Sequence, residues 1–142
     1  MLWQHIQSAV MPRKFRLPGG DLEYSVLNTV WDLGRASARD IYERVGAPEG
    51  LVYTTIAKVL DRLYAKDLVR RTKIGNAFTY EPAIGRDVVE RARTKAGVSH
   101  ILGSRPRAAI ALLVDAVESL DPTLLDELAH IVATKRRGHD GS

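Results

Sequence analysis

The sequence predicts a mainly α-helical protein with one small β-hairpin, and three observations support this fold class. Apolar residues recur at helical spacing in several separate segments of the 142-residue chain. Between Leu68 and Tyr80 the pattern changes to alternation, interrupted by the turn-forming pair Gly75 and Asn76. After Pro82 the apolar patterns are helical again. We therefore expect an N-terminal domain of helices and a hairpin, followed by a C-terminal domain of helices alone.

Residues 1–16 are predicted to be an N-terminal extension. Its apolar residues are spaced for one or two helical turns, which Pro12 then breaks: Leu2, Trp3, Ile6 and Val10. The pair Gly19 and Gly20 separates this segment from the first strongly periodic one.

Two short helices are predicted next. Asp21 is placed to cap the first helix, which stops at Gly34. Ser37 is placed to cap the second, with Asp40 as its capping-box partner, and this helix ends near Gly46 before a tight connection. The residues expected to face inward are Leu22, Val26, Leu27, Val30, Trp31, Ile41 and Val45.

A third helix is predicted from about Leu51, and its two faces differ sharply. At about 100° per residue, one side gathers the apolar residues Val52, Ile56, Val59, Leu60 and Leu63. The other side gathers the polar residues Thr54, Thr55, Lys58, Asp61 and Arg62. The hairpin follows almost at once, and Pro82 closes its second strand because proline cannot donate to the ladder.

The last sixty residues are predicted to form three helices. Val88, Val89 and Ala92 begin one that runs to about Leu102, and residues 109–117 form another. Asp121 and Pro122 are a cap and a first helical residue, and they open the third. Such short, apolar helices have little core of their own, so we expect a homodimer with a shared core. The alternative is an intramolecular bundle packed on the first domain.

These patterns divide the chain into an extension (1–16), a helix-and-hairpin domain (17–83), a helical dimerisation domain (84–138) and a short tail (139–142). The net charge of +4 modestly favours a polyanionic partner. Up to Pro82 the chain has 12 Lys and Arg against 9 Asp and Glu, and after it 9 against 8. Most of the positive excess therefore lies in the domain that carries the hairpin.

Composition also limits the chemistry that the chain can perform. Without cysteine there are no disulfides, thiolate metal sites or cysteine nucleophiles. The four histidines show no metal-ligand spacing, and no hydrolase, metalloprotease or phosphate-loop motif occurs. We therefore expect neither an enzyme nor a metal or other cofactor. The apolar run 108–114 is too short to cross a membrane, so we expect no membrane insertion and a cytoplasmic location.

Two helices, a short turn and a third helix with an exposed polar face predict a winged helix-turn-helix domain that binds double-stranded DNA. We expect Thr54, Thr55 and Lys58 to read bases and Arg62 to meet phosphate. Lys73 and Asn76, at the hairpin tip, are candidates for phosphate or minor-groove contacts. The backbone amide of Ser37, near a helix start, is a candidate donor to a phosphate. The alternatives are a solvated helix face and a winged-helix module that binds protein rather than specific DNA. The basic residues of the extension, Arg13, Lys14 and Arg16, fit a DNA-bound arm or a solvated tail, and the tail is favoured.

Two stretches carry a family resemblance: GDLEYSVLNTVWDLGRASARDIYERV and LVYTTIAKVLDRLYAKDLVRRTKIGNAFTYEP. They resemble the penicillinase repressor family of bacterial transcriptional regulators, the BlaI, MecI and CopY type. The resemblance covers about residues 17–82 closely. It implies a winged-helix N-terminal domain, a helical dimerisation domain and a homodimer that represses transcription from a palindromic operator. It places recognition-helix contacts on Thr54, Thr55, Lys58 and Arg62, and the wing on residues 73–76.

The same resemblance raises the question of how repression ends. Members of this type often control beta-lactam resistance or another stress response, and a membrane sensor protease induces them by cleavage in the C-terminal region. The Asn-Phe dipeptide that is cleaved in staphylococcal-type members has no counterpart in residues 111–118. The paired cysteines of copper-responsive members are absent too. Thiolate copper sensing is therefore excluded, and the inducing signal is left open.

Overall fold

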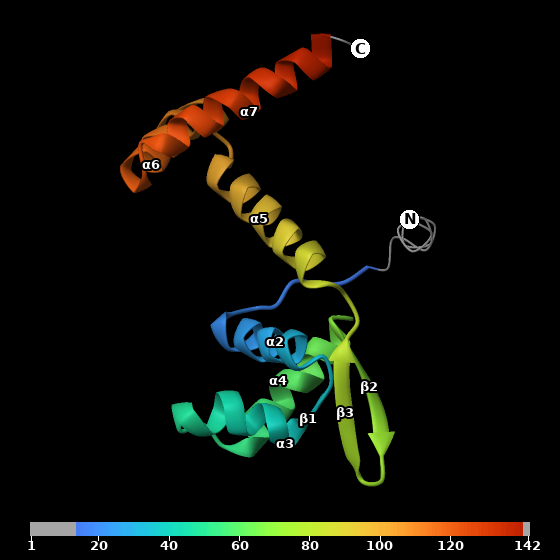
Figure 1. Cartoon of the computed structure of the whole chain (residues 1–142). Helices are drawn as coiled ribbons and strands as arrows, with labels where there is room; N and C mark the ends of the chain where they lie inside the picture. Colours follow the sequence, from blue (N-terminus) through green and yellow to red (C-terminus); the bar gives the residue numbers. More distant parts are fainter. Residues whose placement is uncertain (1–13, 141–142) are drawn as a thin grey trace. The chain divides into compact units, whose positions relative to one another are not determined.

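The computed structural model describes residues 14–140, which are mostly helical with a small three-stranded antiparallel sheet (Figure 1). The chain forms two compact units, one ending at Arg93 and the other beginning at Thr94. The predicted fold class, mainly α with a β-hairpin wing, is confirmed. The short helix expected within residues 1–13 lies outside the described residues.

Three helical segments enclose the core of the first unit. They are α2 (Asp21–Leu33), α3 (Ala38–Ile41) and α4 (Tyr53–Ala65). A π-helical turn, η1 (Tyr42–Gly46), and a 3-10 turn, η2 (Ala47–Glu49), continue α3 towards α4. The fully buried side chains are Val26, Leu27, Val30, Ile41, Ile56, Val59, Leu60, Leu63, Leu68 and Val89. The predicted inward faces of α2 and α4 are therefore the ones that form the core.

Two details at the helix starts differ from the sequence prediction. Asp21 does not cap α2, because it is already the first helical residue and Gly20 is the N-cap without a side-chain bond. Val52 was expected to face inward but is 62% exposed. It is the N-cap residue of α4 and has an extended backbone, so the helical periodicity does not yet apply to it.

The sheet has the order β1-β3-β2, with β1 (Ala36–Ser37), β2 (Val69–Ile74) and β3 (Ala77–Pro82). Ile74 pairs with Ala77, so the hairpin loop is the predicted pair Gly75 and Asn76. Gly75 has φ 64°, the positive value that the first loop position of a type II′ turn requires. The sequence did not predict β1, whose two residues pair with Tyr80 and Thr79 across the fold.

The first compact unit also includes the beginning of α5 (Arg86–Leu102). Trp31 Nε1 donates to the Ile84 carbonyl at 2.9 Å, and Arg86 Nη2 lies 2.8 Å from Asp32 Oδ1. Val89 is fully buried in the same core. These contacts attach the first turns of α5 to α2.

The second unit contains the rest of α5, then α6 (Pro106–Leu120) and α7 (Thr123–Asp140). Asp121 Oδ1 accepts hydrogen bonds from the Thr123 amide at 2.9 Å and from the Thr123 hydroxyl at 2.8 Å, which confirms the predicted cap. Within residues 14–140, neither α6 nor α7 has a buried residue. No helix in this described range is long and apolar enough to span a membrane.

Candidate nucleic-acid interface

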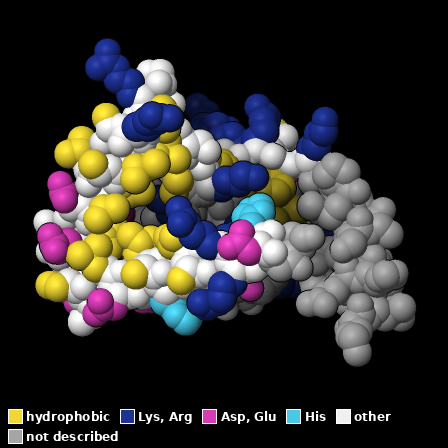
Figure 2. Space-filling view, turned by 90° about the horizontal axis from the view of Figure 1, so that it is seen from above, with side chains coloured by type: hydrophobic (Ala, Val, Ile, Leu, Met, Phe, Trp, Pro, Cys, Tyr) yellow, Lys and Arg dark blue, Asp and Glu magenta, His cyan; other side chains and the backbone are white. Residues whose placement is uncertain are grey.

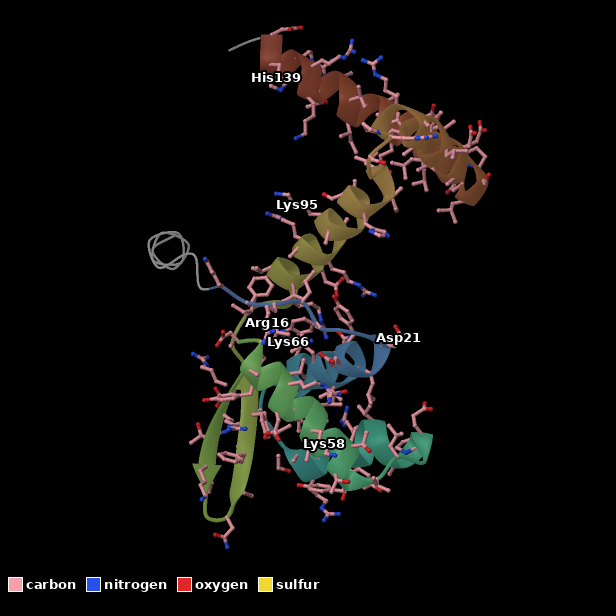
Figure 3. All side chains as sticks on the ribbon, turned by 180° about the vertical axis from the view of Figure 1, so that it is seen from behind. Arg16, Asp21, Lys58, Lys66, Lys95 and His139 are labelled. Carbon is pink, nitrogen blue, oxygen red and sulfur yellow. The ribbon has the colours of Figure 1, made fainter. Side chains whose placement is uncertain are left out.

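Helix α4 has one buried and one solvent-facing side. Ile56, Val59, Leu60 and Leu63 are fully buried, while Thr54, Lys58 and Arg62 are exposed and Thr55 is half-buried. Figure 3 labels Lys58 on α4 and Lys66 just beyond the C-terminal end of the helix. The four residues expected to contact DNA therefore share the side of α4 that does not pack on the core.

Gly46 sets how closely α3 and its η1 extension approach α4. A Cβ atom at this buried position would lie 2.7 Å from Tyr42 Cδ1 and 2.8 Å from Ile56 Cγ1. Atoms at these distances overlap, so only glycine allows the observed packing. The Leu51 amide donates to the Gly46 carbonyl at 2.9 Å and closes the turn before α4. Gly46 thus fixes the direction in which α4 presents its polar side.

The end of α4 sets where the hairpin begins. Asp67 has φ 63°, and its amide donates to the Tyr64 carbonyl at 3.1 Å. The Leu68 amide donates to the Leu63 carbonyl at 3.0 Å, which completes a Schellman motif. Leu68 and Val69 are buried and lead directly into β2. Lys73 and Asn76, both exposed, lie at the far end of this hairpin.

Ser37 occupies the predicted capping box, and this changes the DNA contact that it can make. Its amide donates to Asp40 Oδ2 at 3.1 Å, and its hydroxyl accepts from the Asp40 amide at 3.1 Å. In this structure Ser37 has its amide engaged by Asp40, so the expected bond from that amide to a phosphate stays a prediction and would require displacement of the carboxylate. Its hydroxyl hydrogen is left as the group that can donate to a phosphate.

Ser37 and Asn76, far apart in sequence, line one hollow of about 250 Å³ between α3, α4 and the hairpin. Arg39, which the sequence did not single out, lines it too, as does Tyr53, whose place at the edge of the apolar face suggests either a core residue or a phosphate-contacting hydroxyl. Arg39 is exposed, and its Cζ lies 5.1 Å from the centre of the Tyr53 ring. Arginine, serine, asparagine and tyrosine all supply donors that bind phosphate oxygens. Arg39, two residues after the capping serine, could have been found as the only cation on the predicted second helix before Arg44.

Arg62 of α4 pairs with Glu23, a carboxylate of α2. Its Nε lies 3.3 Å from Glu23 Oε2, and its side chain is 53% exposed. Lys66 Nζ lies 2.7 Å from Glu23 Oε1, which also accepts from the Gly19 amide at 3.0 Å. Burial acts to raise the pKa of Glu23, but the bonds from Lys66, Gly19 and Arg62 outweigh it and lower that pKa. Lys66, whose side chain is 17% exposed, therefore belongs to the fold rather than to the exposed surface.

Asp61, which had no partner in the sequence analysis, pairs with the hairpin. Arg71 Nη1 lies 3.1 Å from Asp61 Oδ1. The Arg71 guanidinium carbon also lies 3.9 Å from the Tyr64 ring centre and 4.4 Å from that of Phe78. No spacing in the sequence relates a residue of α4 to one ten positions later in β2, so only the folded chain reveals this pair.

Within the described part of the chain, no group of three or more His, Asp or Glu side chains is placed to hold a metal ion. Across the same residues, every buried side-chain nitrogen or oxygen has a hydrogen-bond partner. The chemistry that the surface offers is hydrogen-bond donation and positive charge. Donors and positive charge are what contacts to nucleic-acid bases and phosphates require.

Helix-turn-helix geometry followed by a two-stranded wing defines the first unit as a winged-helix domain. The chain belongs to the penicillinase repressor family, because the model of that family, "Penicillinase repressor", matches residues 19–134. The BlaI-type resemblance seen in the sequence is confirmed.

Two curated relatives illustrate the family relationship. Transcriptional regulator BlaI of Mycobacterium tuberculosis is 31% identical over 121 residues, covering 84% of this chain and 86% of that protein. The penicillinase repressor of Staphylococcus aureus is 24% identical over 110 residues, covering 78% and 86%.

Solved structures show weaker overall similarity. The solution structure of the DNA-binding domain of the repressor BlaI has a TM-score of 0.47 and 23% identity, covering 51% of this chain and 89% of that one. The crystal structure of the PcaV regulator of Streptomyces coelicolor with its ligand has a TM-score of 0.45 and 22% identity, covering 83% and 89%.

Proposed function

We propose that this chain is a transcriptional repressor that binds double-stranded operator DNA as a homodimer. The observation that carries the proposal is the polar side of α4, which is presented beside the wing while the opposite side is fully buried. Helices of this kind enter the major groove and contact base edges near their N-terminus. We assign DNA binding to residues 17–83 and self-association to residues 84–138.

The side chains divide into two groups by the contacts that they can make. Thr54, Thr55 and Lys58 belong to the first half of α4 and are assigned to base edges. Arg62, the wing residues Lys73 and Asn76, and the Ser37 hydroxyl are assigned to the phosphate backbone. The first group sets sequence preference, and the second sets affinity and salt dependence.

Self-association is supported by apolar side chains that the second unit leaves exposed. Leu112 is 69% exposed and Leu120 is 81% exposed. Further exposed apolar residues of these helices are Val98, Ile101, Ile110, Ile131 and Val132. Figure 2 shows hydrophobic side chains gathered on one side of the face that it presents. A second copy would bury such residues in a symmetric interface and would give a palindromic operator its two-fold match.

The genes under control are proposed from the names of the relatives. The staphylococcal relative is named penicillinase repressor, so genes for beta-lactam resistance or another stress response are the first candidates. A membrane sensor protease is a candidate partner for induction. Cleavage at Asn-Phe is not available to this chain, because neither of its asparagines precedes phenylalanine. Any proteolytic release must therefore use a different bond.

The test uses the full-length protein and DNA from upstream of its own gene and the neighbouring genes. DNase footprinting locates the operator, and fluorescence anisotropy measures affinity across a salt series. We expect a protected palindrome, with affinity that falls steeply as salt rises. Protein that binds no upstream DNA in preference to random DNA would contradict repression and favour the protein-interaction module instead.

The dimer is tested separately by sedimentation at micromolar concentration. The wild-type protein should sediment as a dimer, whereas Leu112→Asp should shift it to monomer and weaken operator binding. Asp115→Asn, on the same helix and also exposed, is the matched control and should leave the dimer intact. A wild-type monomer at this concentration would contradict the homodimer.

A further inference from the structure

Arg71 connects the two elements of the proposed DNA-binding surface. It lies in β2, two residues before Lys73, and its side chain reaches back to α4. There its guanidinium group pairs with Asp61 and is stacked between Tyr64 of α4 and Phe78 of β3. A planar guanidinium favours this arrangement, because it can stack on aromatic faces and keep its edge free for a carboxylate.

Asp61, the carboxylate that Arg71 binds, lies on the polar side of α4 that is proposed to face DNA, where a negative charge is unfavourable. Asp61 follows Lys58 by one turn and has a side chain that is 66% exposed. It also lines the hollow that contains Ser37, Arg39 and Asn76. An unpaired carboxylate there would repel the phosphates that the neighbouring donors attract.

The contact does more than pair two charges. An ion pair with so exposed a carboxylate adds little to the folding free energy. Tyr64 and Phe78 are 43% and 38% exposed, whereas the Arg71 side chain that contacts both rings is only 26% exposed. The contact does, however, hold the base of the hairpin against the last turns of α4. The wing tip, with Lys73 and Asn76, extends from that base.

We propose that Arg71 is a positioning residue of the DNA-binding surface, which fixes the wing against α4 and neutralises Asp61. The role rests on the proposed function, because it matters only if α4 and the wing bind one DNA duplex together. Arg71 itself does not contact DNA in this proposal. Its removal should misplace the wing and expose a repulsive carboxylate, so the loss should exceed that of one positive charge.

Arg70 provides a matched control for the loss of charge. It is the preceding residue of the same strand and is exposed, and its Nη2 makes only a long hydrogen bond, 3.5 Å, to the Pro82 carbonyl within the hairpin. Arg70→Met and Arg71→Met remove the same charge from adjacent positions. We expect Arg71→Met to weaken operator binding about tenfold more than Arg70→Met does, a coupling within the range found for contacting residues.

A double substitution separates the effect of the unpaired Asp61 charge from a loss of affinity caused by a disturbed fold. Asp61→Asn alone should change affinity by less than about twofold, because the rings still hold Arg71. Added to Arg71→Met, it should restore part of the lost affinity, since the unpaired carboxylate is gone. Equal losses for Arg70→Met and Arg71→Met, or no restoration by Asp61→Asn, would overturn the proposal.

Two further measurements test whether Arg71 positions the wing. If the wing is misplaced, Lys73→Met should cost less affinity in the Arg71→Met background than in the wild-type protein. Amide hydrogen exchange of the DNA-free proteins should show faster exchange across residues 72–78 in Arg71→Met but not in Arg70→Met. Should Arg71→Met fail to fold, Arg71→Lys keeps the charge without the planar stacking and should show the exchange effect alone.

The outcomes separate this role from the proposed function. Failure of the wild-type protein to bind upstream DNA would contradict the proposed function and this role with it. Normal wild-type binding with unchanged wing exchange in both Arg71 variants would contradict only the role of Arg71.

Discussion

Lys66 Nζ and Glu23 Oε1 lie 2.7 Å apart and join the end of α4 to the first turn of α2. Glu23 is 9% exposed and carries the most buried charge among the core-facing side chains of the described residues. A carboxylate in such a position is stabilised only while its donors stay in place. Protonation of the Glu23 carboxylate would therefore weaken the contact that holds the end of α4 against α2.

Glu23 should make stability depend on pH in the acid range. Its pKa is lowered in the folded protein from the ordinary 4.5, so the folded state binds protons less readily than the unfolded state. The stabilisation is therefore present above the unfolded value and is lost as the pH falls through the folded one. We expect Glu23→Gln to be less stable than the wild type near neutral pH. Chemical unfolding from about pH 6 to about pH 3 should show the two curves converging.

Glu49→Gln is the control for Glu23, since Glu49 is exposed in η2. It should follow the wild-type curve throughout. If the difference in the free energy of unfolding between the wild type and Glu23→Gln stays constant with pH, the ionisation of Glu23 is not the source of the effect.

Gly46→Ala should destabilise the first unit. The new methyl group would overlap Tyr42 and Ile56, and overpacking of this kind costs about 1–3 kcal/mol in the free energy of unfolding. Gly97→Ala, in α5 where a Cβ meets nothing within 4 Å, should instead stabilise by up to about 1 kcal/mol. Urea denaturation of both variants measures the contrast. If the two variants have equal free energies of unfolding, the side chains of Tyr42 and Ile56 can move aside for the new methyl group without loss of stability.

Asp67→Gly should stabilise the protein. Asp67 adopts φ 63° at the end of α4, a left-handed conformation that glycine accepts without steric cost. The expected gain is about 0.5–1 kcal/mol, because the Schellman hydrogen bonds of the backbone do not need the side chain. Asp67→Ala should move the midpoint of thermal unfolding in the opposite direction. A lower midpoint for Asp67→Gly would mean that the carboxylate supplies a contact worth more than the strain.

Thr55→Val and Lys73→Met should weaken DNA binding in different ways. Valine keeps the shape of the half-buried threonine and removes its hydroxyl, so it should cost about 1–3 kcal/mol on the preferred operator and relax specificity there. Lys73→Met should weaken all sequences alike and lower the salt slope by about one unit. Anisotropy titrations on operator and random duplexes at several salt concentrations measure both. Indistinguishable profiles would refute the assignment of bases to α4 and phosphate to the wing.

Local signals in the sequence predicted most elements of the fold. The capping box of Ser37 and Asp40, the turn at Gly75 and Asn76, and the cap at Asp121 each depend on residues within four positions of one another. The apolar stripe of α4 is equally local, and four of its five predicted members are fully buried. The assignment of particular residues to DNA stays a prediction, because contact requires a partner molecule.

Features that depend on distant residues could not be predicted in this way. The strand β1 exists because Ala36 meets Tyr80, and Asp61 is neutralised because Arg71 folds back onto α4. Glu23 is buried by Lys66, Arg62 and the backbone of Gly19, not by any pattern around it. The hollow shared by Ser37 and Asn76 likewise forms only when the hairpin lies beside α3 and α4.

The sequence by itself determined the helices, their apolar faces, the hairpin turn and the family, because periodicity, capping and turn chemistry act between near neighbours. Tertiary structure alone decided which cations stay exposed on the proposed DNA-binding surface. The side chains of Lys66 and Arg71 are paired with Glu23 and Asp61 and are only 17% and 26% exposed. Arg62 also pairs with Glu23 but is 53% exposed, and Lys58 and Lys73 are exposed as well. The physical reason is that an ion pair forms between charges close in space, and the folded chain sets those distances.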